Sequence, residues 1–252
     1  MNILSLCTRR TEDSKVFDVY WRTGLTIKGR VIVTMSDSRV ENDEIIAAEL
    51  AVTRYLLEDR NVCGHNKSGK GLTIRAGFGA IRKLLREDSD KSYLSPYANF
   101  LRTRFAGACV EIENRKIEWA NEECDRDVAE LLVNGPVLAT IVVGNIGEVE
   151  LTSHALQRYI ERAEVSPLNG WRKMVAWARK ATRLNHSPKS WRTRLKYQKE
   201  AVFAVSHNLE MLLVIAPPRA GRTLPTLVTV HPVEPWLRDD IIRLQSEQPL
   251  IA

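Results

Sequence analysis

Apolar residues follow two different periods along the first half of the chain. Alternation of apolar and polar residues, typical of half-buried strands, covers the runs 16–21, 30–35, 72–76 and 108–114. Apolar residues that recur every three or four positions, typical of helices, cover 45–59, 78–88, 96–105 and 121–133. Strands and helices in this order predict a mixed sheet with helices packed on it, which is an α/β fold.

The order of elements changes near residue 138. The apolar, glycine-containing run 138–151 predicts a linking strand or hairpin, and helical patterns follow at 153–163 and 170–184. Three strand-like runs then come at 201–207, 210–216 and 226–232. Two helices followed by a short antiparallel sheet predict a smaller α+β domain. We therefore expect two domains, at residues 1–138 and 139–252.

Basic residues are concentrated in the second half. The chain has 252 residues, with 37 Lys and Arg against 31 Asp and Glu, so its formal net charge is +6. Residues 1–135 are balanced at 21 against 21, whereas residues 136–252 carry 16 against 10. Residues 171–199 contain ten Lys or Arg and no acidic residue. A basic segment of this kind is typical of proteins that bind nucleic-acid phosphates.

The sequence has no pattern typical of a membrane protein. The N-terminal run lacks the charge order and apolar length of a signal peptide, and no stretch reaches the roughly 18 apolar residues of a membrane-spanning helix. The four cysteines have no close pair, which favours free thiols in a reducing compartment. We expect a cytoplasmic protein with no membrane partner.

The run LTSHALQRYIERA (151–163) places His154, Arg158 and Arg162 four residues apart. At about 3.6 residues per turn, a helix presents these side chains as one stripe. Histidine transfers protons near neutral pH, and the planar guanidinium of arginine binds two phosphate oxygens at once. The stripe therefore suits the binding or the cleavage of a phosphodiester.

A second polar group lies in TLVTVHP, where Thr229 and His231 share one face of a predicted strand. RNA cleavage through the 2′-hydroxyl needs a base, an acid and cations around the phosphate. We expect His154 and His231 to transfer the protons, the two stripe arginines to hold the phosphate, and Thr229 to assist. This chemistry requires neither a metal nor another cofactor.

The motifs SHALQRYIER and TVHP, with two helices before a sheet, resemble the barnase, EndoU, colicin and mRNA-interferase class of small ribonucleases. The resemblance covers about residues 150–235. It implies a toxin-like fold in which His, Lys, Arg, Thr or Tyr side chains lie on a sheet face against a helix.

Each of these residues also has an ordinary structural interpretation. The stripe arginines could pair with Glu150, Glu161 or Glu164 on a solvated helix face. His154 could hydrogen-bond at the helix cap, and His231 could face solvent at a strand end.

Aromatic residues are interleaved with the cations of the basic segment, and exposed aromatics stack on the bases of single-stranded RNA. The expected RNA-binding residues are Arg172, Lys173, Lys189, Trp191, Arg192, Arg194, Lys196, Tyr197 and Lys199. An acidic protein is the alternative partner. We expect the partner to be single-stranded or structured RNA, with the ribosome as a further candidate.

Two runs in the first half, IIAAELAVTRYLLED and NEECDRDVAELL, resemble ribonuclease H over about residues 16–133. In that family the first helix and a late Asn-Glu-x-Cys-Asp pattern carry metal-binding carboxylates, which implies Glu49 and Asp125 here. Asp18 is the candidate for the carboxylate of the first strand.

One ligand of that family is missing from this sequence. The family has an aspartate at the end of the strand before the second helix, whereas RAGFG places Ala76 or Gly77 there. Two-metal cleavage needs several carboxylates around two cations. We therefore expect a degenerate metal site, and a first domain that acts as a scaffold.

The sequence as a whole predicts an RNA-binding protein that is a metal-independent endoribonuclease acting through its C-terminal domain. Two alternatives stay open. One is a non-catalytic RNA- or ribosome-binding adaptor, and the other is a metal-dependent ribonuclease H-like nuclease that uses Asp18, Glu49 and Asp125.

Overall fold

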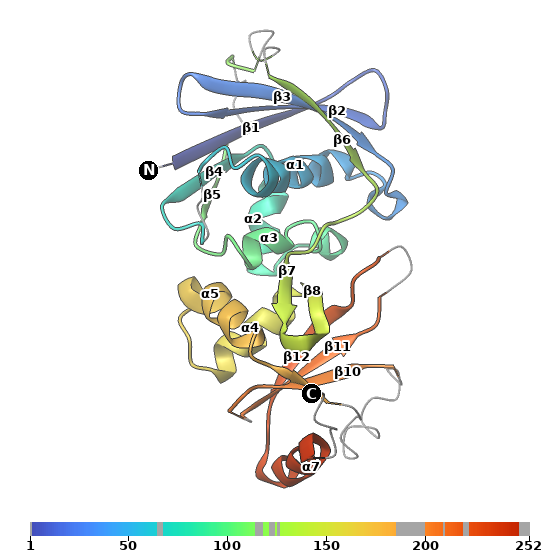
Figure 1. Ribbon diagram of the computed structural model, residues 1–252. Coiled ribbons are helices and arrows are strands. Elements are labelled where there is room, and N and C mark those ends of the chain that lie inside the picture. The colour runs from blue at the N-terminus through green and yellow to red at the C-terminus, as the bar shows by residue number, and fades with distance from the viewer. Residues whose placement is uncertain are drawn as a thin grey trace. The chain divides into compact units, whose positions relative to one another are not determined.

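The computed structural model describes residues 2–64, 68–113, 118–120, 124, 127–184, 200–208, 210–218 and 222–246. The chain divides into two compact units, Met1–Leu138 and Ala139–Ala252. Each unit has a six-stranded sheet with helices packed against it (Figure 1). Both sheets combine parallel and antiparallel pairs, so both units are mixed α/β structures.

The first unit contains, in chain order, β1 (Asn2–Arg10), β2 (Val16–Thr23), β3 (Ile27–Met35), η1 (Ser38–Val40), α1 (Glu44–Arg54), η2 (Tyr55–Asp59), β4 (Leu72–Ala76), α2 (Gly79–Arg86), η3 (Ser92–Leu94), α3 (Asn99–Arg102), β5 (Cys109–Ile112) and β6 (Val128–Val133). The strand order is β5-β4-β1-β2-β3-β6. Neighbours within β1–β3 are antiparallel, whereas β4 is parallel to β1, β5 to β4 and β6 to β3.

The core of the first unit lies on the face of its sheet that α1 covers (Figure 1). Leu6 of β1 and Val19 of β2 are fully buried there together with Leu50 of α1. Because side chains alternate along a strand, the intervening residues point to the opposite face. On that face Tyr20 packs with Cys124 in a separate small cluster.

Three predictions for the first unit are wrong. The described end of the helix predicted at 121–133 is strand β6, in which Leu131 packs against the core while Leu132 is 63% exposed. The helix predicted at 96–105 is reduced to the four residues of α3. The first strand of the sheet, β1, is absent from the predicted elements, so the strand predicted at 16–21 is the second one.

The second unit contains, in chain order, β7 (Thr140–Val143), η5 (Gly144–Ile146), β8 (Gly147–Leu151), α4 (Ser153–Arg162), α5 (Pro167–Ala178), β9 (Thr182–Arg183), β10 (Val202–Val205), β11 (Met211–Ala216), β12 (Thr226–Pro232) and α7 (Pro235–Ser246). The strand order is β7-β8-β12-β11-β10-β9. The hairpin, the helix at 153–163 and the three later strands are confirmed. The helix predicted at 170–184 is confirmed only in part, because α5 ends at Ala178 and Thr182–Arg183 form strand β9. The sheet is not purely antiparallel as predicted, because β8 pairs with β12 in parallel.

Helices cover both faces of the second sheet (Figure 1). Leu156 of α4 and Met174 of α5 pack with Leu213 on one face. Leu237 of α7 packs with Leu212 on the other. Helix α7 is absent from the predicted elements. It covers the second face of the sheet and forms a second hydrophobic core there. Within the described residues, no helix combines the length and apolar character that crossing a membrane requires.

Candidate functional site

The predicted stripe of one histidine and two arginines forms on α4. Thr152 caps the helix, because its Oγ1 accepts a hydrogen bond from an amide of the first turn at 3.1 Å. The same hydroxyl donates to the Leu227 carbonyl at 3.1 Å, which ties the start of α4 to β12. His154 and Arg158 are exposed. Arg158 forms an ion pair with Glu161 at 2.9 Å, as the solvated-face interpretation expects.

Thr229 and His231 lie on the opposite face of the sheet from α4. In the β11–β12 pairing, Thr229 is opposite Val214 and His231 is opposite Leu212. Residues directly opposite each other in an antiparallel pair point to the same face, and Val214 and Leu212 belong to the core beneath α7. The predicted meeting of His154 and His231 around one phosphodiester is therefore wrong.

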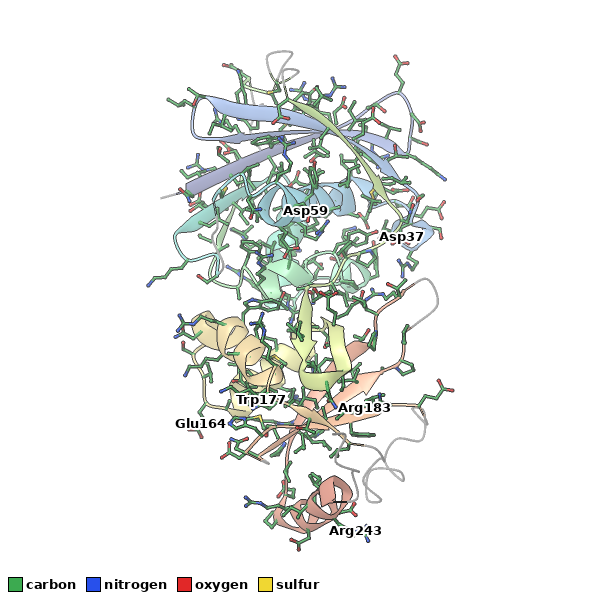
Figure 2. The ribbon with its side chains drawn as sticks, viewed as in Figure 1. Asp37, Asp59, Glu164, Trp177, Arg183 and Arg243 are labelled. Atoms are coloured by element: carbon green, nitrogen blue, oxygen red, sulfur yellow. The ribbon has the colours of Figure 1, made fainter. Side chains whose placement is uncertain are left out.

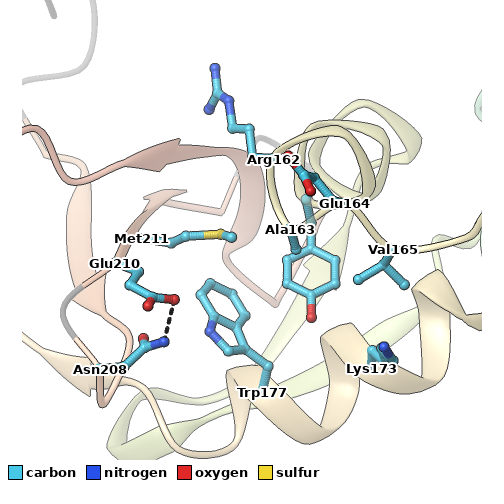
Figure 3. Close-up of a pocket in the computed structure, with 10 residues that line it drawn as sticks. Arg162, Ala163, Glu164, Val165, Lys173, Trp177, Asn208, Glu210 and Met211 are labelled. Carbon is cyan, nitrogen blue, oxygen red and sulfur yellow. Dashed lines mark hydrogen bonds between the residues drawn. The ribbon is translucent and has the colours of Figure 1, made fainter.

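A pocket of about 410 Å³ lies where the end of α4 meets α5 and the β10–β11 turn (Figure 3). Its lining includes Tyr159, Arg162 and Glu164 from α4 and its end, Lys173 and Trp177 from α5, and Asn208, Glu210 and Met211 from the turn and the start of β11. This volume falls in the range of natural small-ligand sites.

Two aromatic rings form a wall of this pocket. The ring centroids of Tyr159 and Trp177 are 5.1 Å apart and the rings are tilted by 39°. Burial raises the pKa of the Tyr159 hydroxyl. Trp177 is only partly buried, and a partly exposed indole offers a flat surface on which a planar ligand can stack.

An amide and a carboxylate lie beside this wall. Asn208 donates a hydrogen bond to the carboxylate of Glu210, and both side chains lie next to the indole of Trp177 (Figure 3). The buried hydroxyl of Ser206 accepts hydrogen bonds from the amides of Glu210 and Met211, at 3.1 and 3.0 Å. Ser206 therefore has a structural role, which is to hold the turn that presents the amide and the carboxylate.

Arg162 is the stripe residue that lines the pocket. Its Nη1 is buried and has no hydrogen-bond partner among the described residues. Burial, and then the neighbouring charge of Arg158, lower the pKa of Arg162, while Glu161 acts in the opposite direction. A buried donor without a partner costs free energy comparable to a lost hydrogen bond. The position therefore favours an anionic group that accepts from this guanidinium.

The backbone at the end of α4 has an uncommon conformation. Glu164 has a φ of 50°, in the left-handed region where glycine is the usual residue. The Val165 amide then donates to the Ile160 carbonyl at 3.1 Å, which closes the helix. Glu164 is labelled in Figure 2, at the C-terminal end of this helix. This geometry holds an acidic side chain at the rim of the pocket.

Four exposed cations follow α5 and the turn after it. Arg172, Lys173, Arg179 and Lys180 are exposed, and none forms an ion pair with another described residue. Arg172 and Arg179, the C-cap residue of α5, are seven residues apart, which is nearly two helical turns. Lys173 and Lys180 follow them directly in the chain. We call these four residues the basic face of α5.

The described structure covers only part of the predicted RNA-binding segment. Arg172 and Lys173 belong to the basic face of α5. The other predicted residues lie outside the described residues: Lys189, Trp191, Arg192, Arg194, Lys196, Tyr197 and Lys199.

Comparison with family models, with curated proteins and with solved structures finds no match to this chain. Sequence patterns do not group Tyr159, Trp177, Asn208 and Glu210, because they lie on three elements that meet only in the fold. The polar tip of the turn between two apolar strands, at 207–210, is the local signal that could have indicated a functional loop.

The first unit buries one carboxylate completely. Glu49 of α1 is 0% exposed, and it accepts hydrogen bonds from the Thr8 hydroxyl at 2.6 Å and from the Gly77 amide at 2.7 Å. Burial raises the pKa of Glu49 to about 7, although both hydrogen bonds act to lower it. Glu49 thus contacts Gly77 at the end of β4. At this position the family that the sequence resembles has an aspartate, which this chain lacks.

Asp18 does not join Glu49. It lies on β2 beside Val19, which faces the α1 side, so Asp18 points to the opposite face of the sheet. There it forms an ion pair with Arg30 at 2.9 Å. Asp125 lies outside the described residues. Within the described parts of the chain, no three His, Cys, Asp or Glu side chains form a group that could hold a metal.

Proposed function

We propose that the protein binds RNA through its second unit, and that the predicted histidine pair does not cleave the bound RNA. The observation that carries this proposal is the basic face of α5. Its four cations are exposed and unpaired among the described residues. Guanidinium and ammonium groups in such a row neutralise successive phosphates and release counterions. The separation of His154 from His231 favours the adaptor interpretation over the endoribonuclease one.

The pocket next to this face favours single-stranded RNA. Lys173 belongs to both the basic face and the pocket lining, so a strand bound on α5 passes the wall formed by Tyr159 and Trp177. Bases of single strands stack on such aromatic side chains, whereas paired bases are not accessible to them.

We also propose that the first unit is a ribonuclease H-like scaffold without metal-dependent activity. The contact between Glu49 and Gly77 supports the resemblance, because it joins the first helix to the end of the strand before the second helix. Thr8 and Gly77 contribute a hydroxyl and an amide where two-metal chemistry needs further carboxylates.

The test of RNA binding is its dependence on salt. Binding of the full-length protein to a labelled single-stranded RNA is measured by fluorescence anisotropy over a series of salt concentrations. Each phosphate contact adds about 0.7 to the slope of log K against log salt for single strands. The double variant Arg179→Ala, Lys180→Ala removes two such contacts, so we expect weaker binding and a slope smaller by about 1.4.

A matched control lies on α2 of the first unit. Arg82 and Lys83 are also an adjacent, exposed pair without an ion pair among the described residues. Arg82→Ala with Lys83→Ala makes the same change of charge and should leave the slope unchanged. Equal losses in the two double variants, or binding indifferent to salt, would contradict the proposal.

The RNA should stay intact with EDTA and with magnesium, and cleavage in either condition would contradict the non-catalytic assignment.

A further inference from the structure

We propose that the pocket of the second unit receives one unpaired base of the bound RNA and selects guanine. This inference rests on the proposed RNA binding and deepens it. Three features of the pocket match the parts of a nucleotide. They are the aromatic wall of Tyr159 and Trp177, the amide and carboxylate of Asn208 and Glu210 beside it, and the buried Nη1 of Arg162.

The carboxylate and the amide match the edge of guanine. Guanine presents two adjacent donors, N1–H and the 2-amino group, and the two oxygens of Glu210 can accept from both. The carbonyl oxygen O6 comes next on that edge. Asn208 already donates one amide hydrogen to Glu210, and its second hydrogen is available for O6. A base stacked on Trp177 has these groups beside it (Figure 3).

The other bases match this arrangement less well. Adenine turns the lone pair of N1 towards the Glu210 carboxylate, which repels it. Uracil has one N–H between two carbonyl oxygens, and cytosine has a single amino group next to an acceptor nitrogen. A site built to receive donors rejects a base that lacks them, because its own acceptors are then left unpaired.

Arg162 completes the site as a phosphate ligand. In Figure 3 its side chain points away from Trp177 and Glu210, on the far side of Met211. Its buried Nη1 has no partner among the described residues, and a phosphate oxygen next to the stacked base would supply one. A phosphate is the ligand that a planar guanidinium binds best. The pocket thus offers separate places for a base and for its phosphate.

The experiment compares RNA strands that differ in one base. Binding of the full-length protein is measured for oligouridylates of one length that carry a central guanosine, inosine or adenosine. Inosine keeps N1–H and O6 of guanine but lacks the 2-amino group. We expect the guanosine strand to bind most tightly, the inosine strand less tightly and the adenosine strand least, with guanosine favoured over adenosine by about tenfold or more.

Two carboxylate variants assign the preference to the pocket. Glu210→Gln keeps the size of the side chain and removes one of its two acceptors, so it should lose most of the preference. A far-UV circular dichroism spectrum and a melting temperature equal to those of the natural protein show that this variant is folded. Glu148→Gln is the matched control, because Glu148 is an exposed carboxylate of the same unit outside the pocket lining, and it should keep the preference.

The possible results separate this inference from the proposed function. Equal affinity for the three strands, with salt-dependent binding retained, would overturn the base site and leave RNA binding in place. A guanine preference that survives Glu210→Gln would overturn the assignment to this pocket. Failure to bind any of the strands would overturn both proposals.

Discussion

We expect the buried carboxylate of Glu49 to make the stability of this fold depend on pH. Its carboxylate is fully buried, and its hydrogen-bond partners are a hydroxyl and a backbone amide, neither of which carries a charge. Burial therefore disfavours the ionised form, and the pKa rises from the ordinary 4.5 to about 7. A group whose folded pKa is raised stabilises the fold fully below the unfolded pKa and loses that contribution as the pH rises through the folded pKa.

We predict that Glu49→Gln stabilises the protein above neutral pH. Glutamine can accept from the Gly77 amide and donate to Thr8, so both hydrogen bonds are kept without a charge. Between about pH 4.5 and 7 the natural protein should lose stability that the variant retains. The gain at pH 8 should be about 3 kcal/mol, since the shift from 4.5 to about 7 is roughly 2.5 pKa units and one unit corresponds to about 1.4 kcal/mol.

Urea unfolding from pH 4 to pH 8 measures this effect. Glu41→Gln is the control, because it makes the same chemical change at an exposed position of the same unit. Parallel curves for the natural protein and the Glu49 variant would show that folding does not raise the pKa of Glu49.

At the same scale, the sequence indicated Glu49 but not its surroundings. Its position on an amphipathic helix follows from the spacing of apolar residues. Its partners depend on β1, which is absent from the predicted elements. For the same reason Asp18 is predicted on the first strand, whereas the structure places it on the second strand, β2, where it points to the face opposite α1.

At the scale of elements, β6 shows why a short apolar run is ambiguous. Residues 128–133 read VAELLV, which fits both a helical and an alternating pattern. Tertiary pairing selects the strand over the helix, because this run pairs in parallel with Arg30–Met35 of β3 over its whole length. Local propensity could not predict that partner. The hairpin 140–151 and helices α4 and α5 were predictable because caps, spacing and turns agree there.

The packing of α4 on α5 depends on Gly170. A Cβ at this position would lie 2.4 Å from Cδ1 and 2.5 Å from Cγ1 of Ile160. We predict that Gly170→Ala destabilises the second unit by about 1–3 kcal/mol, as overpacking of a core contact does. In an Ile160→Ala background the same substitution should become neutral, or stabilising by up to about 1 kcal/mol, because alanine has the higher helix propensity.

A double-mutant cycle measured by urea unfolding tests this packing. Asn169→Ala, at an exposed neighbouring position of α5, controls for changes in the helix alone. An equal effect of Gly170→Ala in both backgrounds would mean that Ile160 is not the side chain that limits the approach of the helices.

At the scale of the whole molecule, the predicted catalytic residues lie on different faces of the second sheet. The sequence correctly indicates that Thr229 and His231 share a face and that His154 lies on a helix. It does not say which face that helix covers. The answer depends on the parallel β8–β12 pairing and on α7, neither of which was predicted. Residue types alone therefore favour a catalytic site of His154, Thr229 and His231, whereas the topology places His154 on one side of the sheet and the other two residues on the other.

The division into two units gives a last prediction. A ligand that binds only the native state stabilises it by about 2.7 kcal/mol at a concentration of 100 times its Kd, which slows exchange through unfolding about 100-fold. If RNA binds only the second unit, the amides of β10–β12 that exchange by unfolding of that unit should gain this protection. The amides of β1–β3 in the first unit should gain little, since unfolding of one unit need not open the other.

Hydrogen exchange followed by mass spectrometry, with and without saturating single-stranded RNA, measures the protection of both sets of amides at once. The Arg179→Ala, Lys180→Ala variant at the same RNA concentration should show less protection of β10–β12. Equal protection of both units would instead place the first unit in the RNA-binding surface.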